Sequence, residues 1–282
     1  MAVAVGRRCD TAAVKRLARS RSTAPSPADG RPGVLVTGAA GLLGGVLLNG
    51  LTGTYSCVGL DIVKGPGVDV VADLSRRKRL DTVLTGMSAV VDLAANARMS
   101  ASWKSVVDNN IASTLNVLDA ARAAGVPRVI IASSNHVVGL AERDEPYASV
   151  VAGRYEGLDP TSLPRLRADT AIRADSPYGV GKAFAEVAGR YYAEQHGLSV
   201  ICLRIGSVYP GEGVVEVRDF ATLLTQRDLV QLVERCLAAP LSLRFGVYYG
   251  ISANTWRIWD LDAARDDLGY VPLDDAERWR ES

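Results

Sequence analysis

Two side chains that can do acid–base chemistry stand one helical turn apart in the segment SPYGVGKAFAE. They are Tyr178 and Lys182, and their i, i+4 spacing places both on one face of a helix. A phenol with its ordinary pKa of about 10 is a poor base at neutral pH, but a nearby ammonium stabilises the phenolate. Such a pair can take a proton from a hydroxyl group while hydride leaves the carbon. Because this spacing is also common on solvated helices, its meaning depends on the neighbouring motifs.

Small polar residues end a run of branched apolar residues in the segment RVIIASSNHVVG. The apolar run predicts a buried strand, and Ser134, Asn135 and His136 follow directly at its carboxyl end. Ligands of parallel sheets bind beyond the carboxyl ends of the strands, so we expect this cluster to face a ligand. Ser134 could then hold the reacting oxygen against Tyr178. A histidine after a strand is often only part of the hydrogen-bonded structure, and that alternative stays open for His136.

A glycine-rich turn in VLVTGAAGLLGG predicts a dinucleotide site. Gly38 allows a tight turn, Gly41 lets a pyrophosphate approach the backbone, and Gly44 lets the helix pack close to the strand. Free N–H groups at the start of the helix bind the phosphates. Asp61 ends the second predicted strand, where a carboxylate can accept hydrogen bonds from the adenosine ribose. Its charge would repel a 2′-phosphate, so NAD is favoured over NADP, although the nearby Lys64 tempers this preference.

The fold that positions these motifs can be predicted, because short apolar runs alternate with helical patterns along the chain. The predicted strands cover residues 34–38, 56–63, 69–74, 89–95, 128–134 and 199–209. Nearly continuous apolar strands separated by helices indicate a parallel sheet that is covered on both faces. We therefore predict an α/β fold, a doubly wound (Rossmann) parallel sheet with a small C-terminal substrate-binding region.

We expect three parts along the chain: a basic tail over 1–33, an NAD-binding Rossmann domain over 34–209, and a small substrate-binding cap over 210–282. The tail carries RSRSTAPSPADGRPG, which has too little apolar surface to pack, and is predicted to be disordered. A long polar segment, 140–174, is inserted into the Rossmann domain. Loops of this length are often lids or oligomer contacts.

Composition narrows the function classes. The 282 residues are 48% apolar and 22% charged, with a net charge of +1, and no apolar run reaches the roughly 18–20 residues of a membrane span. Residues 1–33 carry seven basic and two acidic side chains, so the remainder has a charge of 1 − 5 = −4, which argues against nucleic acid as the main ligand. The four cysteines show neither CxxC nor zinc spacing, so we expect no metal site and a reducing, cytoplasmic location.

Taken together, the motifs resemble the extended short-chain dehydrogenase/reductase family, also called the NAD-dependent epimerase/dehydratase family. The resemblance covers about Val34 to Pro272 and implies a catalytic set of Ser134, Tyr178 and Lys182. It also implies that Asn110 of NNIAST holds a proton-relay water, the alternative being an asparagine that faces solvent. The cofactor-binding residues that it implies are Gly38, Gly41, Leu42, Leu43, Gly44, Asp61, Asp73, Leu74, Ala94, Ala95, Tyr178, Lys182 and Ile205.

Within this family the segments ASSNHVVG, YGVGKAFAE and LRIGSVYP are similar to the hexuronate dehydrogenases, which oxidise the anomeric hydroxyl of a uronic acid with NAD to a lactone. The resemblance implies that Ser134, Asn135 and His136 contact sugar hydroxyls and that Ser207 lies on the carboxylate side. A carboxylate also calls for an arginine. Arg218 is the better match, and Arg98 is a second candidate. The chain departs from the pattern in the long segment between Ser134 and Tyr178.

Other interpretations stay open. Sugar-nucleotide dehydratases place Asp and Glu after the fifth strand, where this chain has Asn135 and His136, so that chemistry is excluded. A nucleotide-sugar epimerase or ketoreductase is the main alternative, although the cap is short for a nucleotide sugar. A non-catalytic NAD-binding regulator is a third, but a pure binder has no use for the tyrosine and lysine pair. Members of the family commonly dimerise through two long helices, here near 102–123 and 176–196, and we expect a homodimer or higher homo-oligomer.

Overall fold

The computed structural model describes residues 30–280 of the chain. Residues 1–29 and 281–282 lie outside the described residues, and with them most of the predicted disordered tail and Cys9. The described residues form seven strands: β1 (Gly33–Thr37), β2 (Ser56–Asp61), β3 (Val70–Val71), β4 (Ala89–Asp92), β5 (Arg128–Ser134), β6 (Ser199–Ile205) and β7 (Phe245–Gly250). The first six fall inside the six predicted segments, except that β1 begins at Gly33.

All seven strands pair in parallel in one sheet with the order β3-β2-β1-β4-β5-β6-β7. The predicted α/β doubly wound sheet is confirmed. The chain runs outward from β1 to β3 and then returns to place β4 on the other side of β1. This reversal between β1 and β4 is the switch point of the sheet, where the loops after two neighbouring strands diverge and leave room for a ligand.

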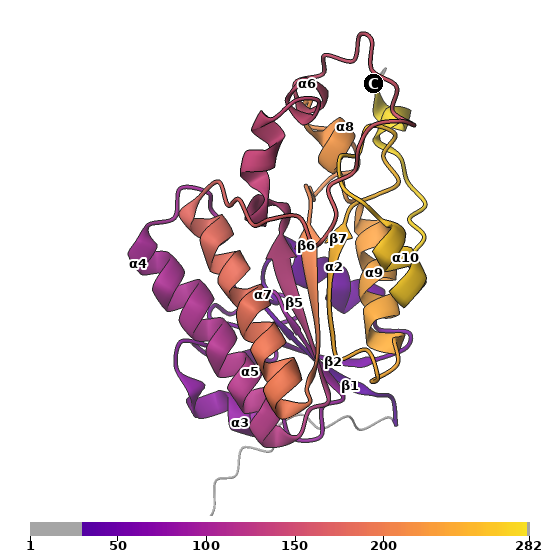
Figure 1. Ribbon diagram of the computed structural model, residues 1–282. Coiled ribbons are helices and arrows are strands. Elements are labelled where there is room, and N and C mark those ends of the chain that lie inside the picture. The colour runs from indigo at the N-terminus through magenta and orange to yellow at the C-terminus, as the bar shows by residue number, and fades with distance from the viewer. Residues whose placement is uncertain (1–29, 281–282) are drawn as a thin grey trace, which may run out of the picture.

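Helices cover both faces of the sheet, as Figure 1 shows. The helices on one face are α3 (Leu80–Val83), α4 (Trp103–Val106), α5 (Ala112–Ala124) and α7 (Pro177–His196), and those on the other are α2 (Leu42–Gly50), α9 (Gln226–Ala238) and α10 (Asp262–Leu268). Alternate residues of the strands serve the two layers: Val129 and Ile131 of β5 pack on the first, Ile130 and Ala132 on the second. Strands buried on both faces explain the continuous apolar runs in the sequence.

The inserted segment and the C-terminal region pack together. The inserted segment 140–174 is not an irregular loop, because it contributes most of the 3-10 turn η4 (Gly139–Arg143) and the helix α6 (Tyr147–Val151). With α8 (Asp219–Thr222) and residues near the C-terminus, it surrounds a third apolar core that includes Val150, Leu166 and Trp259. Conversely, β7 completes the sheet and α9 packs against α2, so the predicted boundary after residue 209 does not separate the layers.

Helix α7 carries the tyrosine and lysine pair, and its ends follow the sequence signals. The side chain of Ser176 accepts a hydrogen bond from the backbone N–H of Gly179, and Pro177 occupies the first turn. Both features are favourable at a helix N-terminus. Gly197, at a φ of 70°, ends the helix in the left-handed conformation. The first turn of α7 is therefore fixed in place beside the end of β5.

Candidate active site

Two adjoining cavities lie at the carboxyl ends of the central strands. The first, of about 480 Å³, is lined by the turn after β1 and the loop after β4. The second, of about 580 Å³, is lined by residues at the ends of β5 and β6 and by α7. Residues such as Leu43 and Ala95 line both, so the two cavities adjoin. The switch point of the sheet thus carries a binding site of the size that cofactors and small ligands use.

The glycine turn is built as predicted. Gly38 has a φ of 67°, a conformation that disfavours side chains. A Cβ on Gly44 would lie 2.3 Å from the carbonyl oxygen of Gly38, so only glycine lets α2 begin this close to β1. Gly41 is the N-cap of α2 and offers no side-chain hydrogen bond, which leaves the first backbone N–H groups of the helix free for a ligand. These features fit the binding of a diphosphate.

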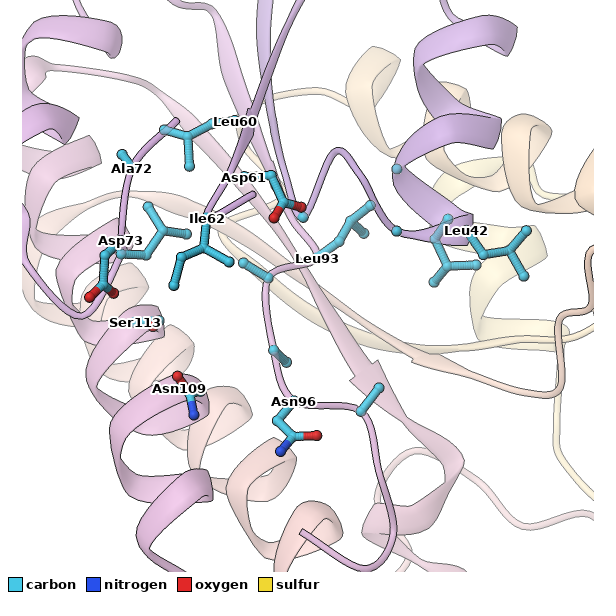
Figure 2. A pocket seen from close by; sticks show the side chains of 18 residues that line it. Leu42, Leu60, Asp61, Ile62, Ala72, Asp73, Leu93, Asn96, Asn109 and Ser113 are labelled. Atoms are coloured by element: carbon cyan, nitrogen blue, oxygen red, sulfur yellow. The ribbon is translucent and has the colours of Figure 1, made fainter. Parts of the chain in front are cut away.

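Two acidic side chains lie on the wall of the first cavity. Figure 2 shows Asp61 at the end of β2 and Asp73 further along the chain, both on the wall of the first cavity. The Asp61 carboxylate also accepts hydrogen bonds from the backbone N–H groups of Ala40 (3.0 Å) and Val63 (3.1 Å), which fixes it against the glycine turn. No Lys or Arg of the described chain lines this cavity, Lys64 included, so it suits a ribose diol better than a 2′-phosphate.

Every cofactor-binding residue that the resemblance implies lies on one of the two cavity walls. The first cavity carries Gly38, Gly41, Leu42, Leu43, Gly44, Asp61, Asp73, Leu74, Ala94 and Ala95, and the second carries Tyr178, Lys182 and Ile205. The sequence analysis missed five further residues of the first wall that follow β4 or project from the next helices: Leu93, Asn96, Ala97, Asn109 and Ser113. Figure 2 shows Asn109 and Ser113 projecting from neighbouring turns.

Asn110 does not reach either cavity. It lies in the π-helical turn η2 (Val107–Ile111) and is only 2% exposed, so the alternative of a solvent-facing asparagine is wrong. Its Oδ1 accepts the backbone N–H of Asn96 (2.9 Å), and its Nδ2 donates to the Asn96 carbonyl (3.2 Å). The side chain therefore holds the loop after β4 in shape. Its role in a proton relay stays a prediction.

The second cavity brings the three catalytic candidates together. Ser134, Tyr178 and Lys182 all line it, and all three are buried. The Lys182 ammonium lies 5.7 Å from the centre of the Tyr178 ring and donates to the Ala132 carbonyl at 2.6 Å. No Asp or Glu of the described residues lines this cavity. The arrangement offers a phenol, a hydroxyl and an ammonium to a ligand, but no carboxylate that could act as acid or base.

Asn135 and His136 line the same cavity. The Nδ2 atom of Asn135 is buried and has no hydrogen-bond partner within the described chain, an unusual state for a buried donor outside a binding site. His136 is held from behind, because its Nδ1 lies 2.7 Å from Oδ2 of Asp175. Asp175, which the sequence analysis did not identify, stands just before the N-cap of α7. Its contact leaves the other ring nitrogen of His136 available for a ligand.

The floor of the site contains a buried ion pair. Arg204 of β6 donates from Nε and Nη2 to the carboxylate of Glu186 on α7, both at 2.9 Å, and the two side chains are 3% and 5% exposed. Ser133 donates to the same carboxylate at 2.5 Å. Burial alone would lower the pKa of Arg204, but the hydrogen bonds and charge of Glu186 outweigh it and raise that pKa. This pair ties α7 to β6 beneath Tyr178 and Lys182.

Ser207 and Arg218 also line the second cavity, as predicted. The Ser207 hydroxyl shares a hydrogen bond with the hydroxyl of Thr222 at 2.8 Å. The Arg218 guanidinium is already paired: Nε and Nη2 donate to the carboxylate of Glu142 at 2.7 and 2.6 Å. The second candidate, Arg98, is exposed and lines neither cavity. The structure therefore favours Arg218 over Arg98 as a group that a substrate can meet.

The described residues were compared with the requirements of a metal site and of a membrane-spanning helix. No group of three or more His, Cys, Asp or Glu side chains in residues 30–280 could hold a metal ion. Over the same residues, none of the helices combines the length and the apolar character that crossing a membrane requires.

Comparisons with known proteins place these features in a family. The model of the NAD dependent epimerase/dehydratase family matches residues 34–239. An NAD-dependent glucose-6-phosphate dehydrogenase of Haloferax volcanii is 35% identical, over 86% of this chain and 94% of its own. An L-arabinose 1-dehydrogenase (NAD(P)(+)) of the same organism is 34% identical, over 86% of this chain and 97% of its own. Both relatives act on free or phosphorylated monosaccharides, as their names state.

The fold is shared with solved structures as well. The crystal structure of a mutant uronate dehydrogenase from Agrobacterium tumefaciens, complexed with NAD, superposes with a TM-score of 0.73. It is 30% identical in sequence, and the match covers 89% of this chain and 88% of that one. A uronic acid, a sugar phosphate and a neutral pentose thus appear as substrates in the names of similar proteins.

Proposed function

The chain belongs to the NAD-dependent epimerase/dehydratase family, and on that premise we propose that it oxidises the anomeric hydroxyl of a free sugar or sugar acid to a lactone. It is an NAD-dependent dehydrogenase. The observation that carries the narrower proposal is the wall of the second cavity. Ser134, Tyr178 and Lys182 line it beside the cofactor cavity, and no carboxylate does so among the described residues.

The proposed roles follow from these positions. Tyr178 accepts the proton of the C1 hydroxyl, Ser134 holds the oxygen that becomes the lactone carbonyl, and Lys182 supplies positive charge that favours the phenolate. Bound NAD would supply the acceptor for the hydride of C1. The C1–H and O–H bonds break as the bond between C1 and the hydroxyl oxygen becomes a double bond, and the proton leaves through Tyr178. Asn135 and His136 hydrogen-bond the other sugar hydroxyls.

Binding of the cofactor rests on the first cavity. The backbone around Gly38 to Gly44 would hold the diphosphate, and Asp61 would accept hydrogen bonds from the hydroxyls of the adenosine ribose. Lys182 and Ile205 would lie on the nicotinamide side, where the two cavities adjoin. We therefore propose that the residues implied by the resemblance are the functional ones.

A hexuronate is the narrower substrate that the sequence predicts. Ser207 and Arg218 line the cavity, which supports an acidic sugar. The ion pair between Arg218 and Glu142 opposes it, because a substrate carboxylate would meet a guanidinium that already has a partner. We therefore propose the wider class: free aldoses and their uronic acids, with a hemiacetal hydroxyl at C1.

The test is a panel of free sugars, uronic acids and nucleotide sugars, incubated with the purified protein and NAD while NADH formation is followed. We expect NADH and a lactone with at least one free sugar or uronic acid. Tyr178→Phe should lower kcat by about 10²–10⁴-fold at saturating NAD. Conversion of a nucleotide sugar with no build-up of NADH would instead support the epimerase alternative. A Tyr178→Phe variant with unchanged kcat would contradict the mechanism.

We propose two further properties. The exposed apolar side chains on the outer face of α5 and α7, among them Leu115, Val187 and Tyr191, support a homodimer through these helices. Light scattering of the purified protein would test this. The described cysteines Cys57, Cys202 and Cys236 are free thiols, which supports a reducing compartment such as the cytoplasm.

A further inference from the structure

Arg218 marks the part of the substrate cavity that follows β6. Lys182 is the only other Lys or Arg of the described chain on this wall, and it lies beside Tyr178. Ser207 and Tyr209 line the cavity near Arg218. The charge around Arg218 therefore decides which group a substrate can place there.

Glu142 occupies the Nε/Nη2 edge of Arg218, one of the edges through which arginine binds a carboxylate at two points. Its two oxygens accept Nε–H and Nη2–H in the two-point geometry that arginine forms with carboxylates, and the side chains are only 13% and 22% exposed. The hydrogen bonds and charge of Glu142 outweigh the burial of Arg218 and raise the pKa of the guanidinium. The remaining nitrogen, Nη1, has one long contact, 3.5 Å to the Thr222 hydroxyl.

A second carboxylate lies close by. Asp219 is fully buried and accepts hydrogen bonds from the Tyr209 hydroxyl (3.1 Å) and from the backbone N–H groups of Val215 and Glu216. Its charge, with those of Glu142 and the exposed Glu216, acts on Arg218. Three carboxylates thus lie around the one cation of this part of the wall, although none of the three lines the cavity itself. An added substrate carboxylate would be repelled, whereas a hydroxyl group could bond to Ser207, Tyr209 or the Nη1 of Arg218.

Glu142 is fixed by the inserted segment. It lies in η4, and the neighbouring Leu140 donates its backbone N–H to Arg173 at 2.9 Å. Arg173 in turn donates its backbone N–H to the carbonyl of Val137 at 3.0 Å, and Ala141 is buried in the third apolar core. Backbone hydrogen bonds therefore join the start of the inserted segment to its end, and they fix the backbone that carries Glu142.

We propose that Glu142 determines the substrate class by keeping Arg218 paired, so that the enzyme prefers a neutral aldose to the uronic acid of the same stereochemistry. This inference rests on the proposed oxidation at C1. The inserted segment then has a function: it supplies from within the chain the carboxylate that an acidic substrate would otherwise bring. A substrate that ends in a hydroxymethyl group or a hydrogen needs no charge partner there.

The test compares sugars that differ only at C6, galactose with galacturonate and glucose with glucuronate, each with saturating NAD. We expect kcat/KM of the wild-type protein to be at least about tenfold higher for the neutral member of the preferred pair. Glu142→Gln keeps the shape and removes the charge, so the ratio should move toward the uronate by about 10–100-fold, the range of one charge-assisted hydrogen-bond pair. NAD binding by this variant confirms that it is folded.

Glu145→Gln is the matched control. Glu145 lies on the same inserted segment but is 63% exposed, and its 3.6 Å contact with Arg154 is far from ideal, so the ratio should not change. A wild-type preference for the uronate would overturn the inference while leaving the proposed function intact. An unchanged ratio in Glu142→Gln would overturn it as well. Failure of all four sugars and of every other free sugar would overturn the proposed function itself.

Discussion

The Nδ1 atom of His136 lies 2.7 Å from Oδ2 of Asp175, although 39 residues separate the two in the chain. The contact fixes the imidazole ring at the wall of the substrate cavity. Asp175→Asn removes the charge that favours one orientation and one tautomer of the ring. We expect kcat/KM for the sugar to fall about 10–100-fold, mainly through KM, because in the proposed mechanism His136 binds the substrate and Tyr178 accepts the proton. Steady-state kinetics would show this, and an equal loss in kcat alone would contradict it.

The same carboxyl group predicts an effect of pH on stability. Burial opposes the ionisation of Asp175, but the hydrogen bond and charge of His136 outweigh it and lower the pKa of Asp175. Because the carboxyl is more acidic in the folded protein, it stabilises the fold above its unfolded pKa of about 3.9, and this contribution is lost as the pH falls through the folded value. Urea unfolding at neutral and acidic pH should show a smaller difference for Asp175→Asn than for the wild type. An identical pH dependence would refute this.

Two adjacent glycines of α2 should respond in opposite ways to alanine. A Cβ on Gly44 would lie 2.3 Å from the Gly38 carbonyl, whereas a Cβ on Gly45 would meet nothing within 4 Å. Gly44→Ala should distort the turn and weaken NAD binding at least about tenfold. Gly45→Ala should bind NAD normally and raise the unfolding free energy by about 0.5–1 kcal/mol, since alanine favours helix. Calorimetric titration and thermal unfolding measure the two effects, and similar NAD affinities in both variants would count against the turn geometry.

The buried pair of Arg204 and Glu186 should be costly to break. Arg204→Met leaves the Glu186 carboxylate buried without its cation, which costs about 3–5 kcal/mol and lowers Tm by roughly 10 °C. Lys104→Met is the control, because Lys104 pairs with Asp108 on the surface, where its side chain is 86% exposed. That change should cost less than about 1 kcal/mol. Thermal unfolding compares the two, and equal losses would show that burial does not set the cost.

The sequence predicted the parts of the molecule that depend on local patterns. The strands, the glycine turn and the polar cluster after β5 all follow from apolar runs and from residues that stand next to each other. Because carboxyl ends of parallel strands meet at one edge, Ser134 and Ser207 could be placed in the same cavity in advance. The prediction that Tyr178 and Lys182 share one face required only that a helix begin before Tyr178.

Contacts between side chains that are far apart in the sequence could not be predicted from these local patterns. Glu142 meets Arg218 across 76 residues, and nothing in the local pattern of the inserted segment indicates which acidic side chain turns inward. Asn110 was placed in the correct helical segment, but the π-helical turn and the loop after β4 decide what its amide contacts. The third apolar core depends on tertiary contacts as well, because it joins residues from the inserted segment and from the C-terminal region.

The central claim is that hydride leaves the anomeric carbon of a free sugar. The most direct measurement uses a sugar substrate that carries deuterium at C1 and follows the label by mass spectrometry. We predict that the reduced cofactor gains one deuterium and that the lactone product has lost it. Reduced cofactor without deuterium, or a sugar whose label stays at C1 while another carbon is oxidised, would contradict the account.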